Sequence, residues 1–212
     1  MTQKHVIVVG AGIVGAMTAF RLATDGARVT LVDAQPAPGR GVSAASFGWI
    51  TCAAGDPDIA AAEYERRLRA IGDYASLDRH FGGRLCVPVR GALLWGDDAA
   101  DTRDWARRHE DRGSDVRLVD AAEIARMEPL LAAPPPLAAW FPRERTIDVS
   151  QACALLVQAA REAGAAIMLG QPVLGIETKG ARASGVRLAT GVIAADGVVV
   201  AAGATVRRWS RS

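Results

Sequence analysis

The chain has 212 residues, of which 50% are hydrophobic and 23% are charged, and its formal net charge is +2. This composition is typical of a globular chain with one large or two small domains, and the nearly neutral charge argues against nucleic acid or an anionic membrane surface as a partner. The three cysteines and three histidines are scattered, without the spacing of a disulfide framework or a metal site. We therefore expect no bound metal. No apolar run reaches the length of a membrane span, so we expect a cytoplasmic protein.

The first predicted elements form a β–α–β unit. A continuous apolar run, His5–Val9, predicts a buried strand, and residues 13–24 have the small and apolar pattern of a helix packed on a sheet. A second apolar run, Arg28–Val32, ends at Asp33. A strand, a helix and a second strand in this order predict a parallel sheet with a right-handed crossover.

A glycine-rich turn with the pattern G-x-G-x-x-G joins the first strand to the helix. Gly10 permits the tight turn, Gly12 lets a pyrophosphate approach the backbone, and Gly15 lets the helix pack closely on the strand. The helix N-terminus offers free N–H groups and a partial positive charge to the phosphates. Asp33 is placed to accept a hydrogen bond from a ribose 2′-hydroxyl and would repel a 2′-phosphate, so NADP is disfavoured. The unit predicts dinucleotide binding, but alone it does not separate FAD from NAD.

The segment after Asp33 is rich in glycine, proline, serine and alanine, which predicts a loop over residues 35–46. Ser43 and Ser46 lie in it, and their hydroxyls and the open backbone amides suit a pyrophosphate and the edge of a flavin. A flexible surface loop is the alternative, but the large apolar residues Phe47 and Trp49 that follow argue against it. We expect this stretch to return towards the N-terminus of the first helix.

The remaining pattern predicts a mixed middle region and then a return to the first sheet. In the middle region we predict helices and short strands at residues 57–81, 91–95, 97–112, 116–119, 120–127 and 138–141. Asp148 and Gln151 form the capping pair of a helix that runs to about residue 163. After it we predict strands at residues 165–169, 173–178, 183–188, 191–193 and 198–202, the middle three antiparallel.

The predicted fold class is α/β. A Rossmann-like FAD/NAD(P)-binding domain with a parallel sheet is expected to be discontinuous and to comprise residues 1–56 and 148–212. Residues 57–147 are expected to form part of an α+β substrate or cap domain.

Five segments in collinear order, from about residue 5 to residue 205, resemble the D-amino-acid oxidase and glycine oxidase (DAO) family of FAD-dependent oxidoreductases, in its N-terminal half. They are VIVVGAGIVGAMTAFRLATDGARVTLVD, SAASFGW, GALLW, EPLL and GVIAADGVVVAAGA. The resemblance implies an enzyme that oxidises a CH–NH bond of an amine or amino acid by hydride transfer to flavin. The resulting imine is hydrolysed, and the electrons pass to O2 or another acceptor. SAASFGW contains no histidine, so we expect FAD to be bound without a covalent link.

The resemblance also assigns cofactor-binding residues, while it leaves the catalytic residues unknown. The pyrophosphate is assigned to the turn residues Gly10, Ala11, Gly12, Ile13, Val14 and Gly15. The adenosine and its ribose are assigned to Asp33, Ala34, Gln35 and Val173. The pyrophosphate and flavin are further assigned to Ser43, Ala44, Ser46, Gly48, Trp49, Ala202 and Gly203.

The sequence departs from the family in two respects. Asp33 stands where members usually have Glu, which is longer but chemically equivalent. The chain also resembles only the N-terminal half, so we expect a truncated or split enzyme, with a partner chain as one source of the missing half. Two alternatives stay open: a non-catalytic FAD-binding fragment or subunit that needs a partner chain, and an NAD-dependent dehydrogenase.

Overall fold

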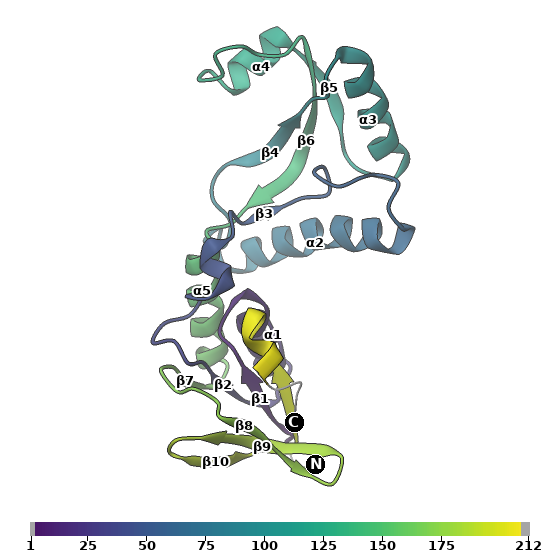
Figure 1. The fold of residues 1–212 in the computed structure, drawn as a ribbon. Helices are drawn as coiled ribbons and strands as arrows, with labels where there is room; N and C mark the ends of the chain where they lie inside the picture. The colour runs from purple at the N-terminus through teal and green to yellow at the C-terminus, as the bar shows by residue number, and fades with distance from the viewer. Residues whose placement is uncertain (1–2, 209–212) are drawn as a thin grey trace. The chain divides into compact units, whose positions relative to one another are not determined.

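The computed structural model describes residues 3–208, which divide by their contacts into two compact units (Figure 1). The first unit comprises Met1–Phe47 and Asp148–Ser212, and the second comprises Gly48–Ile147. The chain therefore enters the second unit after Phe47, ahead of the boundary expected after residue 56. The assignment of the two units to cofactor and substrate domains stays a prediction.

The first unit is built on a parallel sheet of four strands in the order β11-β1-β2-β7, as predicted for an α/β fold. Its strands are β1 (His5–Val9), β2 (Arg28–Val32), β7 (Ala166–Met168) and β11 (Gly197–Val200). Helices α1 (Ile13–Thr24) and α5 (Val149–Glu162) contact one another beside this sheet. Asp148 caps α5 by accepting a hydrogen bond from the Gln151 N–H at 2.9 Å, which confirms the predicted capping residue.

The core of the first unit joins the parallel sheet to an antiparallel ribbon. The ribbon contains β8 (Gly175–Lys179), β9 (Arg182–Leu188) and β10 (Gly191–Ala194), in the order β10-β9-β8. Val186 and Leu188 of β9 pack against Ile7, Val9 and Val32 of the parallel sheet. The continuous apolar runs that predicted β1 and β2 are buried, as the sequence indicated.

The second unit is an antiparallel sheet with three helices. The strands are β3 (Trp49–Ile50), β4 (Arg90–Leu94), β5 (Arg117–Asp120) and β6 (Leu137–Thr146), and each of the others pairs with β6. The helices are α2 (Ala61–His80), α3 (Ala99–Asp111) and α4 (Ala121–Met127). Strand β6 extends beyond the predicted residues 138–141, because β3 pairs with its far end through Trp49 and Thr146. A local sequence pattern does not show such a long-range pairing.

Residues 3–208 contain neither a membrane-spanning helix nor a cluster of metal ligands. No helix in this range is long and apolar enough to cross a membrane. No three His, Cys, Asp or Glu side chains in the same range come together as ligands for a metal ion.

Candidate functional site

The glycine-rich turn is held by close backbone contacts at two of its three glycines. Gly10 has a φ of +108°, and a Cβ built on it would lie 2.5 Å from the carbonyl oxygen of Ala201, just after β11. A Cβ on Gly15 would lie 1.8 Å from the Gly10 carbonyl oxygen. Both positions therefore need glycine for the fold itself, because α1 and the end of β11 approach the turn too closely for a side chain.

Gly12 is different, because the fold leaves space around it. It is the N-cap of α1 with a φ of −71°, which any residue adopts. Within 4 Å, a Cβ at this position would meet only the Ser43 hydroxyl oxygen, at 3.0 Å. Glycine at this position keeps the helix N-terminus open, as the approach of a ligand to the backbone requires.

The N-terminus of α1 has backbone donors that the protein does not use. The Ile13 N–H donates to the Ser43 hydroxyl oxygen at 3.0 Å, and the Ala11 N–H donates to the Asp33 carboxylate. In the described part of the chain, the N–H groups of Gly12, Val14 and Gly15 have no protein acceptor. Free N–H groups at the start of a helix, with the positive end of its dipole, form an anion-binding arrangement.

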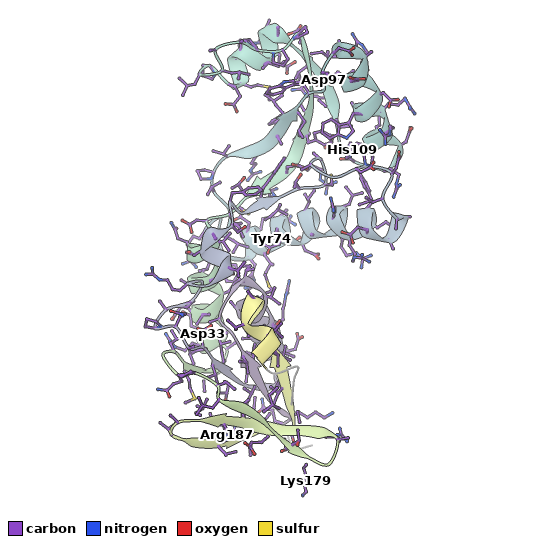
Figure 2. The ribbon with its side chains drawn as sticks, in the orientation of Figure 1. Asp33, Tyr74, Asp97, His109, Lys179 and Arg187 are labelled. Atoms are coloured by element: carbon purple, nitrogen blue, oxygen red, sulfur yellow. The ribbon has the colours of Figure 1, made fainter. Side chains whose placement is uncertain are left out.

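Asp33 lies at the end of β2, next to this turn (Figure 2). One carboxylate oxygen accepts a hydrogen bond from the Ala11 N–H, and the other accepts one from the Gln35 N–H at 2.6 Å. These bonds hold a half-buried carboxylate in place, and each oxygen keeps a second lone pair for a further donor. Ala34 and Gln35 are exposed beside it, and the Gln35 carbonyl accepts a hydrogen bond from the Gly170 N–H at 2.8 Å.

The loop after Asp33 returns to the N-terminus of α1, as predicted. Its Gly39 N–H donates to the Ala11 carbonyl at 2.9 Å, and a short 3-10 helix, η1 (Val42–Ala45), places Ser43 at Ile13. A Cβ on Gly39 would lie 3.1 Å from the Cβ of Cys153 in α5, so the loop packs closely on that helix. Ala44 lies in η1, and Ser46 follows it, donating its N–H to the Ser43 carbonyl at 3.3 Å.

The other predicted cofactor residues fall in three places. Ala202 lies against Gly10, and a Cβ on Gly203 would lie 3.7 Å from a methyl group of Val42. Val173 packs on the core formed by β1, β2 and β9. Gly48 and Trp49 lie in the second unit, where Trp49 pairs with Thr146, so their expected role at the flavin stays a prediction.

Sequence reasoning missed a buried carboxylate in the second unit. Glu144 of β6 is 1% exposed, and its Oε1 accepts three hydrogen bonds from the residues that follow β3. The donors are the Thr51 hydroxyl at 2.7 Å, the Cys52 N–H at 2.9 Å and the Ala53 N–H at 2.8 Å. No local signal marks this glutamate, because its three donors lie far away in the sequence.

His109 of α3 is also fully buried in the second unit (Figure 2). Its Nδ1 lies 2.7 Å from the Tyr64 hydroxyl, and the rings of Trp105 and Phe141 pack against it. His109 is thus a packed residue of the second unit. Burial lowers the pKa of its imidazole to about 4 from the ordinary 6.5, with a smaller contribution from the Arg108 charge.

The lowered pKa of His109 predicts that acid weakens the fold. Between pH 6.5 and about 4, the unfolded chain binds a proton at His109 that the folded chain does not bind. The free energy of unfolding should therefore fall by about 1 to 3 kcal/mol as the pH decreases through this window. Denaturant unfolding at several pH values would measure the loss, and His109→Gln should make the dependence shallower. An equal dependence in both proteins would contradict this account.

The family match and the sequence relatives of this chain agree with one another. Residues 5–212 match the DAO family, described as FAD dependent oxidoreductase. The chain is 33% identical over 174 residues to D-amino acid dehydrogenase 2 of Ralstonia nicotianae, which covers 78% of this chain and 38% of that protein. The chain thus spans well under half the length of this curated relative.

Solved structures show the same fold. Glycine oxidase from Bacillus cereus superposes with a TM-score of 0.79 at 21% identity, covering 98% of this chain and 57% of that one. Iminodiacetate oxidase from Chelativorans superposes with a TM-score of 0.73 at 29% identity, covering 92% of this chain and 54% of that one.

Proposed function

This chain belongs to the DAO family of FAD-dependent oxidoreductases, and from that premise we propose that its first unit binds FAD without a covalent link. The observation that carries the proposal is the set of unused N–H groups of Gly12, Val14 and Gly15 at the start of α1, with the Asp33 carboxylate beside them. A dinucleotide presents the complementary groups, a pyrophosphate anion and ribose hydroxyls.

The residues of the turn fit this cofactor. The open position at Gly12 admits a pyrophosphate to the backbone, and the Ser43 hydroxyl beside it is a further hydrogen-bond donor. Each Asp33 oxygen has capacity for a ribose hydroxyl in addition to its backbone donor. Ala34, Gln35 and Val173 would contact the adenosine, and Ala44, Ser46, Gly48, Trp49, Ala202 and Gly203 are proposed to contact the pyrophosphate and flavin.

The activity that we propose is oxidation of a CH–NH bond in an amine or amino acid. Bound FAD would supply the redox chemistry, as the acceptor of a hydride from the substrate carbon. The named relatives are a D-amino acid dehydrogenase, a glycine oxidase and an iminodiacetate oxidase. Their names favour a substrate in which one carbon carries both the amino group and a carboxylate. The relatives contain a further part that this chain does not match. The turn residues proposed to hold FAD lie in this chain, whether that further part belongs to this polypeptide or to a partner chain.

Gly12→Ala tests the proposed cofactor site, because it should spare the fold. The added methyl group would meet only the Ser43 side chain, yet it would occupy the space at the helix N-terminus. We expect FAD affinity to fall at least about tenfold, equivalent to about 1.4 kcal/mol, with little change in the unfolding midpoint. Titration of FAD followed by flavin fluorescence would measure the affinity.

Gly72→Ala is the matched control for this experiment. A Cβ at Gly72, in α2 of the second unit, has no neighbour within 4 Å. This variant should bind FAD as the unmodified chain does. Unchanged FAD affinity in Gly12→Ala would count against the pyrophosphate position proposed at the turn.

A further inference from the structure

The loop that carries Ser43 packs on a buried cysteine of α5. Cys153 is fully buried, and a Cβ built on Gly39 would lie 3.1 Å from the Cys153 Cβ and 3.3 Å from its sulfur. The Gly39 N–H donates to the Ala11 carbonyl at 2.9 Å. Because Gly39 contacts both Cys153 and the turn before α1, the course of the loop towards α1 depends on the side chain at position 153.

The Cys153 thiol also interacts with the Ser43 side chain. Burial raises the pKa of this thiol to about 11, and a hydrogen bond with the Ser43 hydroxyl opposes that increase. The thiol is therefore neutral at physiological pH, and it can both donate and accept a weak hydrogen bond. A neutral partner for Ser43 suits a site proposed to bind a pyrophosphate, because a thiolate or carboxylate would repel the phosphates.

The Ser43 hydroxyl has one proton to donate and two lone pairs that accept. One lone pair accepts the Ile13 N–H at 3.0 Å. The proton can point to the Cys153 sulfur or, in the proposed complex, to a phosphate oxygen, which is the stronger acceptor. When the proton points to a phosphate, the second lone pair can accept the S–H of Cys153. The thiol can thus remain a partner of Ser43 in both states, because it exchanges the roles of acceptor and donor.

We propose that Cys153 is a positioning residue for the cofactor site, which holds the Ser43 hydroxyl at the N-terminus of α1 with its proton available to the pyrophosphate. The inference rests on the proposed binding of FAD in the first unit, to which Cys153, Ser43 and Ile13 all belong. Cys153 lies in α5, outside the glycine-rich turn and its loop, so no motif of the turn indicates this role.

Two substitutions of Cys153 test this role in titrations of the full chain with FAD. Cys153→Val roughly keeps the volume of the side chain but can neither donate nor accept, whereas Cys153→Ser keeps both abilities. We expect Cys153→Val to weaken FAD binding about threefold to tenfold, as for the loss of one hydrogen bond, and Cys153→Ser to restore most of the affinity. Unchanged affinity in a folded Cys153→Val protein, or equal losses in both variants, would overturn the proposal. Cys86→Val makes the same change in the second unit and should bind FAD as the unmodified chain does.

A double-mutant cycle with Ser43→Ala shows whether Cys153 acts through Ser43. In a chain that already lacks the Ser43 hydroxyl, Cys153→Val should cause little further loss of FAD affinity. A role of Cys153 in packing alone would give the same loss in both backgrounds, which would contradict the proposal. Cys153→Ala takes the place of Cys153→Val in the cycle if Cys153→Val does not fold.

Amide hydrogen exchange at Ile13 tests the role of Cys153 without FAD. In the cofactor-free chain, Cys153→Val should speed the exchange of the Ile13 N–H, because its acceptor Ser43 is held less firmly. Unchanged exchange would count against the role of Cys153, whatever the outcome of the titrations. If the unmodified chain binds FAD and the Cys153 variants bind it equally well, only this inference is wrong. If the unmodified chain does not bind FAD, the proposed cofactor site is wrong as well.

Discussion

Gly15→Ala is expected to destabilise the first unit by about 3 kcal/mol or more. The new methyl group would lie 1.8 Å from the Gly10 carbonyl oxygen and 3.3 Å from the Ala201 side chain. This clash can be relieved only if α1 moves away from β1. Such a movement would disturb the core, in which both elements are packed through Ala16, Ala19 and Ile7. Overpacking that displaces the backbone in this way is among the substitutions that lower the free energy of unfolding most. Thermal or denaturant unfolding of the purified variant would measure the loss.

Gly12→Ala is the matched comparison for this prediction, since it adds the same methyl group three residues away. It should unfold close to the unmodified chain, because only the movable Ser43 hydroxyl is near. The pair separates the role of glycine in the fold from its role in keeping the helix N-terminus open. Equal stability of the two variants would contradict the packing that we describe at Gly15.

Glu144→Leu should weaken the second unit by a comparable amount. The substitution removes the acceptor of three hydrogen bonds and leaves the buried N–H groups of Cys52 and Ala53 unsatisfied. Each unsatisfied buried donor costs about 1 to 3 kcal/mol, so the total loss should reach about 3 kcal/mol. Unfolding followed by tryptophan fluorescence suits this measurement, because four of the five tryptophans lie between residues 49 and 140.

Glu144→Gln is the control for the effect of the carboxylate. Its amide oxygen can still accept the three bonds, so we expect a smaller loss than for Glu144→Leu. A similar and large loss in both variants would mean that the charge, rather than the acceptor, holds the segment. No loss in Glu144→Leu would show that the bonds from Thr51, Cys52 and Ala53 do not stabilise the unit.

The first unit was predictable because its sequence signals are local. The apolar runs at His5–Val9 and Arg28–Val32, the turn glycines and the Asp148 cap each act over a few residues. The structure places β1, α1 and β2 within the predicted limits. The return of the loop to α1 was also predictable. Its residues are small or are serines, which suits a close approach to the helix N-terminus that larger side chains would prevent.

The second unit was less predictable because long-range pairs determine it. The length of β6 depends on pairing with β3, and neither strand shows this partner in its own residues. The Glu144 bonds and the Tyr64–His109 contact join residues 45 or more positions apart. Glu144 lies outside the short strand predicted at residues 138–141, so its burial and its three donors were not predicted.

We propose above that the first unit binds FAD at the turn formed by residues 10–15. Its most direct test is equilibrium titration of the purified full chain with FAD, read by flavin fluorescence and by the visible flavin absorption. We predict saturable binding at one FAD per chain, weakened by Gly12→Ala and unaffected by Gly72→Ala. A folded chain that shows no saturable binding of FAD would contradict the claim.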